Sequence, residues 1–225
     1  MVRRLPRQAL RALTERPVVR AFHRLFYDSG TQTWSNTRWL GVAAQKCPFD
    51  LWVYQELLHE LRPAVIVECG TADGGSALYL ASICDLLGEG EIVTVDIRDL
   101  PGRPQHDRIT YLSGSSIEPG IVQAIQQRVE GRSPVLVILD SNHERDHVLA
   151  EMRLYGPLVT SGSYLVVEDS NINGHPVLPD FGPGPLEAIE AFLAETDEFT
   201  VDESREKYFL TFNPRGYLRR TGAQT

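Results

Sequence analysis

The feature that most constrains the fold is an apolar run that ends in an acid and then breaks at glycines, in the first third of the chain. Residues 65–67 are all β-branched and follow a proline, as expected of a buried strand in a parallel sheet. Gly70, Gly74 and Gly75 allow a sharp turn and a close approach of the backbone to a ligand, after which residues 76–87 can form a helix. The stretch therefore predicts a strand, a ligand-binding turn and the first crossover helix of an α/β fold.

The turn does not carry the dinucleotide-binding fingerprint, because Ala72 stands where the G-x-G-x-x-G pattern requires its second glycine. Glu68, at the end of the strand, would repel a phosphate but could accept hydrogen bonds from an ammonium group. S-Adenosylmethionine has an ammonium and a sulfonium group and no phosphate, so it is the predicted cofactor. The alternative is that Glu68 caps the turn and the glycines only make it tight. The other predicted cofactor contacts of the turn are Gly70, Thr71, Gly74 and Ser76.

Strand and helix patterns alternate through the following part of the chain. Further strands are predicted at residues 91–96, 109–112, 134–139 and 163–167, with helices near 119–130 and 144–155. This alternation is typical of a Rossmann-like fold, in which a doubly wound and mostly parallel sheet carries helices on both faces. Right-handed crossovers then place ligands at the carboxyl ends of the strands.

The C-terminal part departs from this alternation. After a predicted helix near residues 185–195, the apolar segments 199–201 and 208–212 are separated by only a few polar residues. Such spacing predicts an antiparallel hairpin rather than a crossover. A doubly wound sheet closed by a reversed strand is the arrangement shared by methyltransferases that use S-adenosylmethionine.

Asp96, Ser115 and Ser116 follow the next two predicted strands, so they are expected at the same edge of the sheet as the glycine turn. An acid at the position of Asp96 can accept hydrogen bonds from the ribose hydroxyls of a cofactor. Ser115 and Ser116 could contact its adenine end. A helix cap explains Asp96 and a solvated turn explains the serines without a cofactor, so both alternatives stay open.

Asp140, Glu168 and Asp169 follow two further predicted strands. Three carboxylates at adjacent strand ends would repel one another unless a cation neutralises them. Oxygen ligands favour Mg²⁺ over zinc and leave part of its octahedron free for substrate or water. The alternative is that one of these acids contacts the cofactor and the others cap loops. Asp140 is also counted among the predicted cofactor contacts.

His143 lies three residues after Asp140, at the start of the next predicted helix, where it could reach the metal site and remove a proton. A lone histidine in a loop is more often inert, and His147, one turn further on, is expected at the surface or behind the site. The long loop over residues 171–185 is a predicted lid or substrate wall, with His175 as a candidate contact.

Residues 1–30 are predicted to form a basic helical arm, interrupted near Pro17, and residues 31–225 the methyltransferase domain. An amphipathic basic arm can lie on a membrane surface, but contacts between subunits are its commoner use, so a homo-oligomer is expected.

The net charge of −8 argues against a general nucleic-acid-binding protein. Cys47, Cys69 and Cys84 have neither metal-ligand spacing nor an even count, which favours a reducing cytoplasm. No apolar run approaches the length of a membrane span, and the arginine-rich start lacks the apolar core of a signal peptide.

Four motifs together resemble the cephalosporin hydroxylase family. They are KCPFDLWVYQE at residues 46–56, VECGTADGGSA at 67–77, DSNH at 140–143 and VEDSN at 167–171. The likeness covers about residues 37–213. Despite its name, that family is similar to Mg²⁺-dependent methyltransferases that use S-adenosylmethionine, and it includes rhamnosyl and macrolide-sugar O-methyltransferases.

Carried onto this sequence, the resemblance implies that Asp140, Glu168 and Asp169 bind the metal and that His143 is the general base. It also implies cofactor contacts at Glu68, Gly70 and Asp96.

The predicted reaction is methyl transfer from a sulfonium to a hydroxyl group, with Mg²⁺ favouring a vicinal diol as the acceptor. The family resemblance implies a small-molecule acceptor, first a sugar-bearing natural product, as in antibiotic biosynthesis, and second a β-lactam or another secondary metabolite. Two alternatives are an NAD-dependent oxidoreductase, which the missing glycine disfavours, and a catalytically silent subunit, which the set of acids disfavours.

Overall fold

Seven strands form one sheet within residues 7–221, the part of the chain that the computed structural model describes; its side chains are described from residue 15 onward. The strand order is β5-β4-β3-β6-β7-β9-β8. The five strands from β5 to β7 in this order are parallel, whereas β9 runs antiparallel to both of its neighbours. The strands are β3 (Val65–Cys69), β4 (Glu91–Asp96), β5 (Ile109–Ser113), β6 (Val135–Leu139), β7 (Tyr164–Val167), β8 (Phe199–Val201) and β9 (Tyr217–Arg220).

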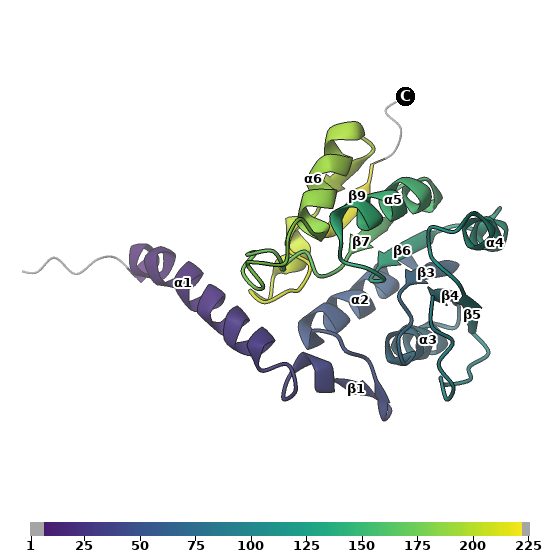
Figure 1. Cartoon of the computed structure of the whole chain (residues 1–225), viewed down its shortest axis with the longest axis horizontal. Coiled ribbons are helices and arrows are strands. Elements are labelled where there is room, and N and C mark those ends of the chain that lie inside the picture. The colour runs from purple at the N-terminus through teal and green to yellow at the C-terminus, as the bar shows by residue number, and fades with distance from the viewer. Residues whose placement is uncertain (1–6, 222–225) are drawn as a thin grey trace, which may run out of the picture.

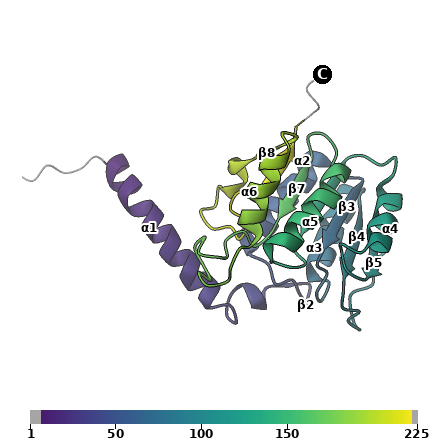
Figure 2. The ribbon, with the colours of Figure 1, turned by 45° about the horizontal axis from the view of Figure 1, so that its top comes forward.

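Helices cover both faces of this sheet, as the alternation of β3 side chains requires (Figure 1 and Figure 2). Val65 and Val67 belong to the core cluster that includes α4, α5 and α6, whereas Ile66 belongs to the cluster with α2 and α3. Most side chains of the parallel strands are apolar, as expected of a parallel sheet buried on two sides, but Glu68 and Thr94 are buried polar exceptions. The helices are α1 (Arg7–Asp28), α2 (Pro48–Leu61), α3 (Gly75–Leu87), α4 (Pro119–Val129), α5 (Arg145–Tyr155) and α6 (Pro185–Glu195).

The central strands end in register, and this places their following loops side by side. Cys69 of β3 pairs with Val95 of β4 on one side and with Leu139 of β6 on the other. The predicted Rossmann-like fold with an antiparallel C-terminal end is therefore confirmed. Short elements complete the structure: β1 (Arg38–Trp39), β2 (Val42–Ala43), and the 3-10 helices η1 (Trp34–Asn36), η2 (Gly156–Leu158) and η3 (Glu203–Glu206).

The predicted hairpin is present, but its second strand was wrongly placed at residues 208–212. Strand β8 pairs with β9, so the returning strand is Tyr217–Arg220. The segment 208–212 instead makes bonds outside the sheet, since the Phe212 amide donates to Asp50 Oδ2 at 2.8 Å. Leu210 and Phe212 are buried in a separate small cluster with Cys47. Their apolar pattern reflects this cluster rather than a strand.

The described part of the N-terminal arm is one continuous helix up to Asp28, so the interruption predicted near Pro17 is wrong. Helix α1 runs from Arg7 to Asp28 with Pro17 inside it, and it extends away from the sheet in both views (Figure 1 and Figure 2). A proline inside a helix costs about 3 kcal/mol but can be tolerated where the carbonyl that loses its partner reaches water. The second copy expected to pack on this arm stays a prediction. No described helix is long and apolar enough to cross a membrane.

His23 anchors the C-terminal half of α1 to the rest of the chain. Its ring stacks on Phe212, with centroids 5.7 Å apart, and its Nε2 accepts a hydrogen bond from the Asn171 amide at 2.9 Å. Burial lowers the pKa of His23 to about 4. The imidazole is therefore neutral in the docked helix at physiological pH.

Acidification should weaken this docking. The free imidazole takes up a proton near pH 6.5, whereas the docked one does so only near pH 4, so stability falls as pH drops through this interval. Between pH 7 and pH 5 the chain should lose about 2 kcal/mol more unfolding free energy than the His23→Gln variant, which has no titrating group there. Urea unfolding at both pH values checks this; equal losses would exclude the linkage.

Candidate active site

A cavity of about 470 Å³ opens at the carboxyl ends of the parallel strands. It gathers most of the residues predicted from the sequence, although they are spread over a long stretch of chain. Those that line it are Gly70, Ser76, Asp96, Ser115, Ser116, Asp140, His143 and Asp169. Four others do not line it, namely Glu68, Thr71, Gly74 and Glu168.

Gly70 lets the turn after β3 approach the turn after β6. Its φ is 102°, and a Cβ placed on it would lie 2.0 Å from the carbonyl oxygen of Asp140. Any side chain there would separate these two loops, so the position requires glycine. Ala72 follows with a φ of 45°, and its amide donates to Asp96 Oδ2 at 2.8 Å. The turn thus fixes the acid at the end of β4.

Glu68 and Thr71 lie below the floor of the cavity. Glu68 is buried, and its Oε2 accepts a hydrogen bond from Thr94 Oγ1 at 2.6 Å. The hydroxyl of Thr71 lies 2.6 Å from that of Thr94. Burial raises the pKa of Glu68 above its usual value, and its Oε1 has no hydrogen-bond partner among the described residues. Direct contact of Glu68 with a cofactor stays a prediction.

Asp96 is held with its carboxylate at the cavity edge. Its Oδ1 accepts the Arg98 amide at 2.8 Å, and Arg103 lies 3.7 Å from its Oδ2. Both carboxylate oxygens thus accept backbone amides, which fixes their direction before any ligand binds. A preformed acceptor at this strand end suits the hydroxyl groups of a ribose.

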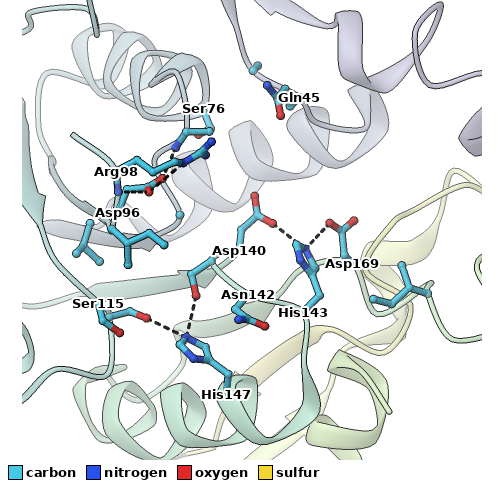
Figure 3. A pocket seen from close by; sticks show the side chains of 18 of the residues that line it. Gln45, Ser76, Asp96, Arg98, Ser115, Asp140, Asn142, His143, His147 and Asp169 are labelled. Carbon is cyan, nitrogen blue, oxygen red and sulfur yellow. Dashed lines mark hydrogen bonds and ion pairs between the residues drawn. The ribbon is translucent and has the colours of Figure 1, made fainter. Parts of the chain in front are cut away.

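His143 lies between two carboxylates, as Figure 3 shows. Its Nε2 is 2.7 Å from Asp169 Oδ2 and 3.5 Å from Asp140 Oδ1. Burial alone would lower the pKa of His143, but the carboxylates of Asp140 and Asp169 raise it to about 10. The imidazole is therefore charged at neutral pH in this arrangement. These three residues each offer a ligand atom within 4.8 Å of the others, which suits a cation.

Lys46 is the counter-ion of the buried acids, a contact that sequence reasoning missed. Its ammonium forms ion pairs with Asp140 and, at 2.7 Å, with Glu168 Oε1. Tyr54 donates a hydrogen bond to the same oxygen of Glu168 at 2.6 Å. Glu168 is thus engaged beneath the cavity, while Asp140 and Asp169 face it. The metal set predicted from the sequence, which includes Glu168, stays a prediction.

The titration of these acids follows from their surroundings. Burial and the neighbouring Asp140 carboxylate raise the pKa of Glu168 to about 8, although Lys46 opposes this. Burial would also raise the pKa of Asp140, but Lys46 and His143 bring it below its usual value. Asp140 therefore stays ionised and available at the cavity, as a ligand for a cation must be.

Apolar side chains form the other side of the cavity. Tyr27 and Trp34 come from the end of α1 and from η1, and Leu178 and Phe181 come from the loop after β7. The predicted lid loop therefore supplies part of the wall, although His175 does not line the cavity and instead contacts Glu187 at 3.0 Å. Sequence reasoning missed Tyr27, at the end of the helical arm, and Trp34, in the polar segment after it, because a lone aromatic residue carries no sign of its tertiary contacts.

Comparisons with known proteins agree with this site. The profile of the Rhamnosyl O-methyltransferase/CmcI family matches residues 31–221. A rhamnosyl O-methyltransferase of Mycobacterium bovis is 44% identical over 211 residues, covering 90% of this chain and 85% of that protein. A rhamnosyl O-methyltransferase of Mycobacterium leprae is 42% identical over 210 residues, covering 90% of each protein.

Solved structures show the same fold. An apo structure of CmcI superposes with a TM-score of 0.64 at 26% identity, over 84% of this chain and 78% of that chain. A second CmcI structure, with Mg and S-adenosylmethionine, has a TM-score of 0.64 at 24% identity over the same shares of the two chains. This chain therefore belongs to the rhamnosyl O-methyltransferase/CmcI family, and its sequence-based classification as an O-methyltransferase is confirmed.

Proposed function

We propose that this chain transfers the methyl group of S-adenosylmethionine to a hydroxyl group of a sugar or sugar-bearing natural product, with Mg²⁺ as a second cofactor. The observation that carries the proposal is the position of His143 between Asp140 and Asp169, in the cavity that also contains Asp96. In the proposal, His143 accepts the proton, Asp140 and Asp169 bind the cation and Asp96 binds the ribose, and the fact that all four line one cavity supports it. The relatives named rhamnosyl O-methyltransferases favour a sugar as the acceptor.

The chain's own residues divide into two groups in this proposal. Gly70 and Asp96 hold the nucleoside part of the cofactor, because the turn permits close approach and the acid accepts hydroxyl hydrogen bonds. Asp140 and Asp169, with Glu168 as the third predicted ligand, hold the metal. A bound Mg²⁺ supplies Lewis acidity that lowers the pKa of an acceptor hydroxyl.

His143 removes the hydroxyl proton as the oxygen–carbon bond forms and the carbon–sulfur bond of the cofactor breaks, which releases S-adenosylhomocysteine. The two carboxylates keep the imidazole charged in the structure, with a pKa of about 10. It can accept a proton only when their negative charge is drawn toward a cation. A bound cation would offset the negative charge of these two acids and so lower the pKa of His143. His143 is therefore suited to act as a base when the metal is bound.

The experiment combines binding and turnover on the purified chain. Calorimetric titration should detect S-adenosylhomocysteine binding but no NADH binding, and transfer of a labelled methyl group to a rhamnoside should require Mg²⁺. EDTA should abolish transfer without abolishing cofactor binding. Binding of NADH in place of S-adenosylhomocysteine would contradict the proposal, as would full transfer activity in EDTA.

A further inference from the structure

Helix α5 presents a row of three polar side chains to the cavity loops. His147, Glu151 and Tyr155 are spaced by four residues, so they lie on one face of the helix, one above another. Glu151 and Tyr155 are fully buried, whereas the side chain of His147 is 20% exposed and lines the cavity. A polar row of this kind inside an otherwise apolar layer calls for a reason beyond packing.

The row contacts both loops that border the cofactor side of the cavity. His147 Nε2 lies 3.3 Å from the hydroxyl of Ser116, in the loop after β5, and 3.3 Å from that of Ser141, in the loop after β6. Tyr155 donates to the Ser116 carbonyl at 2.5 Å, and Ser141 donates to Glu151 Oε1 at 2.5 Å. One helix therefore ties together two loops that follow different strands.

The buried carboxylate of Glu151 is costly for stability. It accepts the Ser141 hydroxyl and lies 3.5 Å from His147, but its Oε2 has no hydrogen-bond partner among the described residues. Burying a carboxylate with incomplete pairing is unfavourable, and an apolar residue would avoid this cost. The carboxylate of Glu151 raises the pKa of His147, which favours the ring form whose Nε2 carries a proton directed toward the serine hydroxyls.

We propose that His147 and Glu151 form a clamp that joins the loops after β5 and β6 and thereby sets the affinity for S-adenosylmethionine. Both residues act as positioning residues, because they hold Ser116 and Ser141 at the cavity wall while His143 and the acids carry out the reaction. This inference rests on the proposed function, since it takes S-adenosylmethionine as the ligand of that wall. The described contacts of the clamp do not involve the apolar side of the cavity, so acceptor binding should not depend on the clamp.

The test separates cofactor affinity from turnover. In His147→Ala and Glu151→Gln, the Kd for S-adenosylhomocysteine and the KM for S-adenosylmethionine should rise about tenfold or more, the effect of losing a charge-assisted hydrogen bond. At saturating S-adenosylmethionine, kcat should stay within about twofold of the unmodified chain. His147→Gln, whose amide can still bridge two hydroxyls, should recover part of the affinity.

His106→Gln is the matched control. His106 also contacts a carboxylate, with its Nε2 3.0 Å from Asp85 Oδ2, but it lies outside the cavity. This variant should bind S-adenosylhomocysteine normally. The clamp is refuted if His147→Ala binds within about twofold of the unmodified chain, or if kcat falls while KM does not change. An equal loss of S-adenosylhomocysteine affinity in His106→Gln would also refute the clamp. Failure of the unmodified chain to bind S-adenosylhomocysteine would instead refute the proposed function.

Discussion

Replacing His143 by alanine should lower kcat by about 10²- to 10⁴-fold while the Kd for S-adenosylhomocysteine changes little, because general-base catalysis contributes about this much. The imidazole lies 2.7 Å from Asp169 and lines the cavity. No other described histidine lies between two acids in this way. Methyl-transfer kinetics at saturating cofactor, together with calorimetry, measure both quantities.

His175→Ala is the control for this variant, since His175 also contacts a carboxylate at 3.0 Å but does not line the cavity. It should keep kcat within about threefold of the unmodified chain. Normal turnover by His143→Ala, or loss of cofactor binding without loss of residual kcat, would remove His143 from the role of base. NMR titration adds an independent check, because Mg²⁺ should lower the pKa of His143 from about 10.

Replacing Lys46 by methionine should destabilise the chain by about 3–5 kcal/mol in the absence of divalent cations, because it leaves buried carboxylates without their partner. The Lys46 side chain is 4% exposed and pairs with both Asp140 and Glu168. A divalent cation can replace part of the lost charge, so Mg²⁺ should raise the Tm of Lys46→Met more than that of the unmodified chain. Thermal unfolding in EDTA measures the loss of stability, and thermal unfolding in Mg²⁺ measures the rise in Tm.

Lys207→Met provides the comparison for this experiment. Lys207 also pairs with a carboxylate, that of Glu56, but its side chain is 44% exposed. Removing such an exposed surface pair should change stability far less than removing Lys46. If the two methionine variants were equally stable in EDTA, Lys46 could not be the counter-ion of the buried acids.

Much of the fold could be predicted because the sequence pattern and the sheet geometry constrain each other. Continuous apolar runs predict parallel strands buried on both faces, and parallel strands with short following loops bring Asp140 and Asp169 to one edge. The second hairpin strand could not be predicted in the same way. Residues 208–212 have a strand-like composition, but the Phe212 amide bonds to Asp50, a contact that no local pattern reveals.

The candidate site, like the fold, could be predicted from the sequence only in part. Glu68 was expected in the cavity because it is near the end of its strand, yet it is still part of β3, and the alternation of the strand directs it toward Thr94. Lys46 begins the motif at residues 46–56, but its contact with Asp140 joins two residues that are 94 positions apart in the sequence. Such long-range ion pairs depend on how the elements pack, and a single sequence contains no direct record of that.

The attachment of α1 to the loop after β7 bears on how the protein can be shortened. Arg24 Nε donates to the Pro176 carbonyl at 3.0 Å, and Tyr27 stacks on Trp34 with ring centroids 5.4 Å apart. Trimming the polypeptide to the segment shared with its relatives, residues 31–221, would delete this brace together with Tyr27, one of the aromatic residues that line the cavity. The trimmed protein would keep its sheet and lose the support that the arm gives to the loop after β7, so expression and crystallisation work should retain the whole arm.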